Sequence, residues 1–166
     1  APAAGLVNRL VALPGVRTLA RWSAGIDQRR GIPAFAPRRF SRWSRRHVAD
    51  VGFRGGGRGE VLLWTDSFTE FFATEQGRAA VGVREAAGDR VVFPRRTAGC
   101  GLTWITTGQR DGARKRLART IETLIPLVSA GIPVVGLEPS CVGVLRSDAV
   151  ELLDDPAHVG LGLGAE

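Results

Sequence analysis

Two cysteines are the residues most able to do chemistry in this chain of 166 residues. Cys141 follows Pro139 and Ser140 at the predicted start of a helix, where free backbone N–H groups and the helix dipole favour a thiolate. Cys100 lies between two glycines, so a ligand could approach the backbone closely there. The competing interpretation is that both cysteines are small, buried apolar residues. On the first interpretation, Cys141 is predicted to be the more reactive thiol.

No other group of residues makes a convincing site. His47 lies in an arginine-rich stretch and His158 near the C-terminus, so neither is well placed for a catalytic triad or a zinc site. The glycine-rich segment 55–59 precedes a predicted strand instead of following one, and it lacks the Lys-Ser/Thr of a phosphate-binding loop.

Short apolar runs alternate with longer segments of helical period, which predicts an α/β fold. Strands are expected over 61–65, 90–94 and 133–137. Helices are expected over 68–87, with a break near Gly77, over 109–130, where Pro126 introduces a kink, and over 140–153. The order β-α-β-α-β predicts a parallel sheet with right-handed crossovers and flanking helices.

The cysteines follow two of these predicted strands. The loops 65–67, 95–108 and 138–141 all leave the carboxyl ends of strands, where parallel sheets bind their ligands. We therefore expect Cys100 and Cys141 to share one pocket, with Ser67 and Glu138 beside them.

The N-terminal third differs from the rest in charge. Residues 1–60 hold 12 arginines and three acidic residues, a net charge of +9, whereas residues 61–166 carry −2. Residues 1–24 have the apolar spacing of one or two short helices interrupted at Pro14. Residues 25–60 are expected to be an Arg/Gly/Pro-rich linker or arm with little regular structure, and 154–166 a frayed tail. The α/β domain is then 61–153, preceded by a helical and Arg-rich extension.

Several classes of protein are disfavoured by the sequence. The apolar run 132–137 is too short to span a bilayer, and no signal peptide is recognisable. Two cysteines do not make a secreted disulfide framework, so a cytoplasmic location is expected. The absence of methionine predicts a fragment of a longer protein. Arginines interleaved with aromatic residues over 38–46 would suit nucleic-acid binding, but an arm lying on an acidic partner is favoured.

Three segments resemble a known family. They are 61–72 (VLLWTDSFTEFF), 95–109 (RRTAGCGLTWITTGQ) and 136–141 (GLEPSC). They are similar to the cysteine-rich CCG domain of iron–sulfur subunits in glycolate oxidase, anaerobic glycerol-3-phosphate dehydrogenase and heterodisulfide reductase. The resemblance covers roughly residues 30–155. It is strongest with FAD-linked 2-hydroxy-acid dehydrogenases that carry a ferredoxin-like segment and then this domain.

The family pattern has five cysteines, and three of them are absent here. The five positions correspond to Ser67, Gly99, Cys100, Glu138 and Cys141. The resemblance implies an iron–sulfur cofactor near these residues, with Cys100 and Cys141 as its metal ligands. A cubane cluster is bound by about four thiolates, whereas this chain has two cysteines. Three interpretations therefore stay open. The domain shares a cluster with a second cysteine-rich repeat, it is a degenerate structural copy, or the two cysteines act as a metal-free thiol pair.

The resemblance implies a C-terminal electron-transfer module of an FAD-linked dehydrogenase of the glycolate or D-lactate type. FAD would lie in the missing part of the protein, and the partners would be FAD-binding and ferredoxin-like domains. No turnover is expected of this chain alone. The location would be cytoplasmic or peripheral to the inner membrane through partners. The alternatives are a non-catalytic docking domain of such an enzyme and an Arg-rich nucleic-acid-binding protein.

Overall fold

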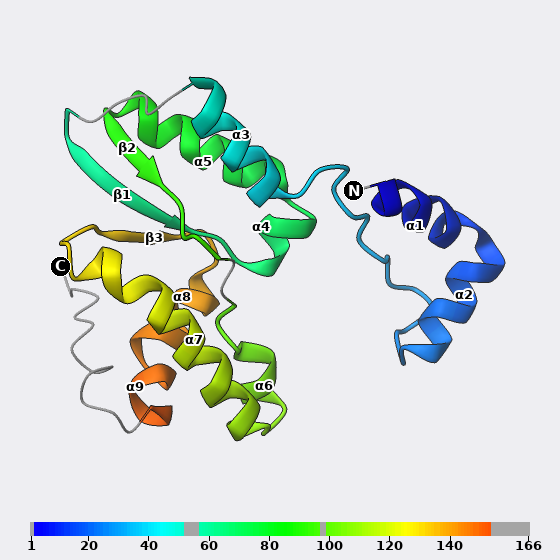
Figure 1. Cartoon of the computed structure of the whole chain (residues 1–166). Coiled ribbons are helices and arrows are strands. Elements are labelled where there is room, and N and C mark those ends of the chain that lie inside the picture. The colour runs from blue at the N-terminus through cyan, green and yellow to red at the C-terminus, as the bar shows by residue number, and fades with distance from the viewer. Residues whose placement is uncertain (1, 52–56, 97–98, 154–166) are drawn as a thin grey trace.

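The computed structural model describes residues 2–51, 57–96 and 99–153, and Figure 1 shows how their elements are arranged. A three-stranded sheet lies at the centre, with helices on both faces. Two further helices at the N-terminus lie to one side of this α/β body. The predicted tail, 154–166, falls outside the described residues.

The sheet is parallel, as the sequence predicts. Its strands are β1 (Gly59–Trp64), β2 (Asp89–Val92) and β3 (Val134–Gly136), and they are ordered β2-β1-β3. Val61 pairs with Val91 on one side of β1, and Leu63 pairs with Val135 on the other. Central β1 is apolar at four consecutive positions because helices cover both of its faces.

One face of the sheet is covered by α3 (Phe40–Val51) and α5 (Thr74–Ala86), with the short α4 (Ser67–Phe71) before α5. Val61 and Leu63 of β1 point to this face and pack with Phe40 and Val81 in one apolar cluster. The opposite face is covered by α6 (Leu102–Thr106), α7 (Arg110–Val128), α8 (Pro139–Arg146) and α9 (Asp148–Leu152).

Three details of the predicted helices are wrong. The helix expected over 68–87 is two helices, and the break lies at Phe72 and Ala73, not near Gly77. The helix expected over 140–153 is interrupted at Ser147. Helix α6 occupies part of what the sequence predicted as a loop. Helix α7 confirms the prediction over 109–130 and continues through Pro126 to Val128.

The expectation of little regular structure is wrong for part of 25–60, because residues 40–51 form α3. Phe40 and Ser44 are buried, so this helix packs against the body through one face. The carboxylate of Glu70 accepts hydrogen bonds from the backbone N–H and the hydroxyl of Ser41, at 3.0 and 2.6 Å. These bonds satisfy donors in the first turn of α3, as N-terminal capping requires.

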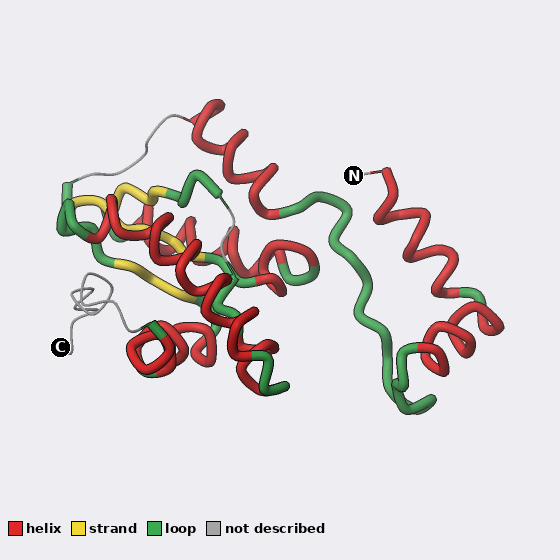
Figure 2. Tube along the Cα trace, turned by 60° about the horizontal axis from the view of Figure 1, so that its bottom comes forward, coloured by secondary structure: helices red, strands yellow, loops and turns green. Residues whose placement is uncertain are grey.

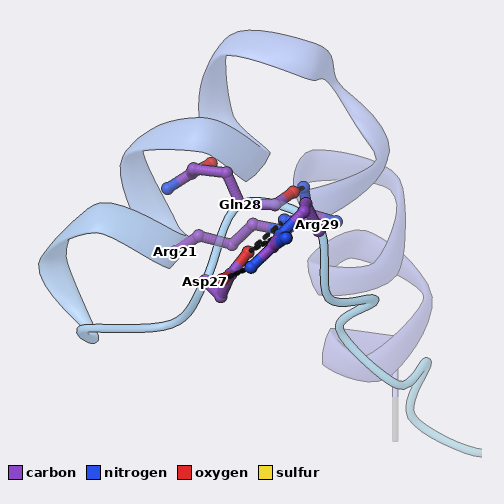
Figure 3. A network of polar contacts seen from close by, with 4 residues as sticks. All are labelled: Arg21, Asp27, Gln28 and Arg29. Atoms are coloured by element: carbon purple, nitrogen blue, oxygen red, sulfur yellow. Dashed lines mark hydrogen bonds and ion pairs between the residues drawn. The ribbon is translucent and has the colours of Figure 1, made fainter.

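The two N-terminal helices, α1 (Pro2–Ala12) and α2 (Pro14–Ser23), confirm the helical pattern predicted for 1–24. The turn after α2 is held by an ion pair of 2.8 Å between Asp27 and Arg29, and by a hydrogen bond from Arg21 to the carbonyl of Gln28 (Figure 3). An extended segment then leads to α3 (Figure 2). It contacts α1 through Asn8, whose side chain makes two hydrogen bonds to the backbone of Phe35.

That segment is also joined to the α/β body. The ring of Phe35 stacks on Phe72 at 4.8 Å, and the N–H of Ala36 donates to the carbonyl of Phe71. Within the part of the chain that the structure describes, no helix has the length and apolar character needed to cross a membrane.

Candidate functional site

The connections of the sheet define where a site would lie. Leaving β1, the chain passes over one face through α5, and leaving β3 it passes over the other through α8. Such a reversal between neighbouring strands opens a crevice at their carboxyl ends, where parallel sheets bind ligands. The loops after β1 and β3 leave the sheet at this edge, and the loop after β2 ends near them at Cys100.

The structure brings Cys100 and Cys141 together at this edge. Their Sγ atoms lie 2.8 Å apart, and both residues are free thiols. Each side chain is buried, with 8% of Cys100 and 9% of Cys141 exposed. The predicted shared location of the two cysteines is therefore confirmed, and the apolar cluster around them includes Trp64 and Leu117.

Cys100 is held by the backbone on either side of it. The carbonyl of Gly99 accepts a hydrogen bond of 2.9 Å from the hydroxyl of Thr120, which is fully buried in α7. Gly101 adopts a φ of +80° and forms the N-cap of α6, a conformation that disfavours side chains. The hydrogen bond between Thr120 and the carbonyl of Gly99 therefore fixes the loop that carries Cys100.

Cys141 is the third residue of α8, after Pro139 and Ser140. Glu138 is the N-cap, and its carboxylate accepts hydrogen bonds from the hydroxyl and the N–H of Ser140, at 2.7 and 3.3 Å. The anion that occupies this helix N-terminus is therefore a carboxylate.

Helix α8 lies close to β3 because Gly136 has no side chain. A Cβ atom at position 136 would collide with Cγ2 of Val142. This close approach sets the position of the first turn of α8, and with it the position of Cys141.

Asp66 is a residue of this edge that was not among those predicted from the sequence. It follows β1 directly and caps α4: Oδ1 accepts from the N–H groups of Phe68 and Thr69, and Oδ2 accepts from the Thr69 hydroxyl. Its charge acts on Cys141, so it lies near the thiol pair. An aspartate between a buried strand and a helix is the signal that would have identified it.

Ser67, predicted to stand beside the cysteines, is exposed at the start of α4.

The expected thiolate character of Cys141 is contradicted by its surroundings. Burial raises the pKa of the Cys141 thiol, the contact with Cys100 raises it further, and the carboxylates of Asp66 and Glu138 act in the same direction. The prediction weighed only the helix dipole. That dipole is already engaged by Glu138, and the apolar surroundings disfavour the anion.

A cluster does not fit the donor set described here. Among residues 2–51, 57–96 and 99–153, no three histidine, cysteine, aspartate or glutamate side chains gather as metal ligands. Two thiols are half of what a cubane cluster needs. Glu138 is engaged by Ser140 and Asp66 by α4, so neither carboxylate is directed to a metal shared with the cysteines.

The arginine-rich segment is also placed by the structure. Phe40 is buried, and Trp43 stacks on His47 at 4.7 Å and lies 5.4 Å from Phe40. Binding of single-stranded nucleic acid relies on aromatic faces that are free to stack on bases. These rings pack within the protein instead, which weakens the nucleic-acid interpretation of 38–46.

Comparison with known proteins finds relatives of this chain among curated proteins. The chain is 29% identical over 154 residues to a subunit of the anaerobic glycerol-3-phosphate dehydrogenase of Escherichia coli strain K12, and equally to the same subunit from E. coli O157:H7. The alignment covers 92% of this chain and 38% of each relative, so the chain spans well under half of the relatives' length. No protein-family model and no solved structure matches. Anaerobic glycerol-3-phosphate dehydrogenase is among the enzymes named above for the CCG resemblance.

Proposed function

We propose that this chain is an electron-transfer module of a flavin-linked dehydrogenase. The observation that carries the proposal is the meeting of Cys100 and Cys141 at the carboxyl edge of the parallel sheet. The CCG pattern has its cysteines after the same three strands. Similarity to a dehydrogenase subunit over 92% of the chain supports the same assignment.

Within this class we propose FAD and iron–sulfur centres in the parts of the protein or complex outside this chain. Two thiols do not complete a cluster, so we place the cluster ligands in a ferredoxin-like segment or a second cysteine-rich repeat. The electron donor is proposed to be a small 2-hydroxy acid, glycolate or D-lactate. Glycerol 3-phosphate is the competing substrate, because the relative is named for it.

A docking role for the N-terminal helices is a second candidate function. Helices α1 and α2 have no acidic residue, and they carry Arg9, Arg17 and Arg21. The helices and the residue between them expose large apolar side chains, among them Leu6, Leu10, Leu13, Leu19 and Trp22. Apolar surface rimmed by positive charge suits a partner with an apolar, acidic face. In this proposal the partner is the flavin-binding part of the dehydrogenase.

The experiment for the first proposal uses the natural protein that contains this sequence, purified without oxygen together with the proteins that copurify. Flavin, iron and sulfide are measured, and dye reduction is followed with glycolate, D-lactate and glycerol 3-phosphate. The proposal expects flavin and iron in the preparation and dye reduction with one of the three substrates. A preparation without flavin that reduces dye with none of them would contradict it.

The docking role is tested with the double variant Leu19→Gln/Trp22→Gln, because these residues are 63% and 76% exposed. The flavoprotein should no longer copurify, while the thermal midpoint of the variant stays within a few degrees of the wild type. Val83→Gln is the matched control, since Val83 is 67% exposed but lies on α5 of the body. Equal recovery of the partner with both variants would refute the role of α2.

A further inference from the structure

We infer that Cys100 and Cys141 form a reversible disulfide and act as a two-electron thiol redox pair, not as ligands of a metal cluster. The inference does not rest on the proposed function, because it concerns only the geometry of the two thiols. They are the only cysteines of the chain, and they come from different elements: Cys100 precedes α6 and Cys141 lies in α8.

The distance between the sulfur atoms is the first argument. Two thiolates on one tetrahedral ion with metal–sulfur bonds of about 2.3 Å lie about 3.8 Å apart. The Sγ atoms here lie 2.8 Å apart, which is closer than such ligands would be. A disulfide bond measures about 2.05 Å, so small rotations of the two side chains would bring the atoms to bonding distance.

The support around the pair is the second argument. Thr120 in α7 fixes the carbonyl of Gly99 beside Cys100, and the first turn of α8 is fixed by Glu138 and by the close packing of Val142 on Gly136. Both thiols are thus held by ordered backbone on the same face of the sheet. The reduced and the oxidised forms can share this backbone, as a reversible pair requires.

The surrounding charge is the third argument. Asp66 and Glu138 are the carboxylates that act on Cys141. If the two cysteines bound a cluster, they would do so as thiolates, and these negative charges would be repelled by the two carboxylates. A disulfide between the cysteines carries no charge, so it avoids this repulsion.

The reaction balances with a disulfide as the co-reactant. One thiol of the pair, as its thiolate, attacks a sulfur of the co-reactant, and the first thiol of the co-reactant leaves. The second cysteine attacks the mixed disulfide, the bond between Cys100 and Cys141 forms, and the second thiol leaves. The protein loses two electrons and two protons, which the co-reactant gains as two S–H groups. A dithiol reverses the reaction.

The test is a redox titration of the whole natural protein with mixtures of oxidised and reduced glutathione. Free thiols are blocked with N-ethylmaleimide, and tryptic peptides 97–110 and 120–146, which hold Cys100 and Cys141, are analysed by mass spectrometry. We expect the two peptides to become joined in one two-electron transition and to separate with dithiothreitol. Prior treatment with an iron chelator should not change the yield.

Variants and metal analysis complete the test. In Cys100→Ser, the joined peptides should disappear and Cys141 should carry glutathione or remain a free thiol, with circular dichroism as the check of folding. Two results would overturn the inference. One is that both cysteines stay alkylatable at every glutathione ratio after denaturation. The other is that joining occurs only after stoichiometric iron and sulfide are removed, which would identify the cysteines as cluster ligands.

Discussion

The ring of Phe40 lies where a side chain of residue 77 would begin. A Cβ atom at Gly77 would be 2.6 Å from Cε2 of Phe40 and 2.7 Å from Cγ2 of Thr69. Gly77 therefore has no room for a side chain, and α3 approaches α5 at this point. Phe40 itself is 1% exposed, so the start of the arginine-rich helix is part of the core.

This contact predicts that Gly77→Ala destabilises the protein. Alanine favours a helix over glycine by about 1 kcal/mol, but overpacking a core costs about 1–3 kcal/mol. The buried ring of Phe40 has little space into which it could move. The free energy of unfolding, measured by urea denaturation, should therefore fall by up to about 2 kcal/mol.

Gly82→Ala is the matched control, because Gly82 lies in the same helix and has no neighbour within 4 Å of its would-be Cβ. It should be neutral or stabilise the protein by up to about 1 kcal/mol. Equal effects of the two substitutions would show that Phe40 does not occupy the space beside Gly77.

The sheet was predictable because each strand is a short apolar run between helical segments, and such an order leaves few topologies. Helix α3 was missed because its arginines dominated the interpretation. Phe40, Trp43, Ser44 and His47 have the i, i+3, i+4, i+7 spacing of a helix face, which was the available signal. The role of Gly77 depends on the ring of Phe40, 37 positions earlier in the chain, so the local sequence could not reveal it.

The meeting of the cysteines was predictable for the same reason as the sheet: residues after parallel strands gather at one edge. The ionisation of Cys141 was not predictable. It depends on burial, on the contact with Cys100 and on two carboxylates, Asp66 in the loop after β1 and Glu138 at the start of the same helix. Burial, Cys100 and Asp66 reach Cys141 only through tertiary packing. The N-terminus of α8 does not favour a Cys141 thiolate, because the carboxylate of Glu138 already caps it. From the sequence, Glu138 was predicted only as a ligand position.

The hydrogen bond from Thr120 to Gly99 predicts a second effect. Thr120→Val keeps the shape of the side chain but leaves the carbonyl of Gly99 without this donor. Loss of a buried partner costs about 1–3 kcal/mol, and the free energy of unfolding should fall by that amount. The loop should also loosen, so alkylation of Cys100 by iodoacetamide should become faster in the native protein.

Thr123→Val is the control for this prediction. Thr123 lies in the same helix, and its hydroxyl donates to the carbonyl of Arg119, but this hydrogen bond is exposed and the residue is only half-buried. Its effect should stay within about 0.5 kcal/mol, and Cys100 should react at the wild-type rate. If both variants lose the same stability, the bond to Gly99 is not what holds the cysteine loop.

Oxidation of the thiol pair should stabilise the protein. The bond would link residues 41 positions apart, and closing a loop of that size restricts the unfolded chain by about 4 kcal/mol in the chain-entropy model. The urea midpoint of the oxidised protein should therefore exceed that of the reduced protein. In Cys100→Ala/Cys141→Ala, dithiothreitol should leave the midpoint unchanged. A lower midpoint in the oxidised wild type would mean that the bond distorts the native backbone.

The raised pKa of Cys141 predicts that the reduced protein loses stability in alkaline solution. In the unfolded chain the thiol ionises near its ordinary pKa of about 8.5, whereas in the folded chain burial and neighbouring carboxylates keep it protonated. Its contribution to stability is complete below about pH 8.5 and is lost as the pH rises toward the folded-state pKa.

The urea midpoint, measured with a phosphine reductant from pH 8 to pH 10.5, should decline in the wild type. Few other groups of this chain titrate in that range, because it has no tyrosine and its only lysine is Lys115. Cys141→Ser should flatten the decline, and an equal decline in this variant would assign the effect to other groups.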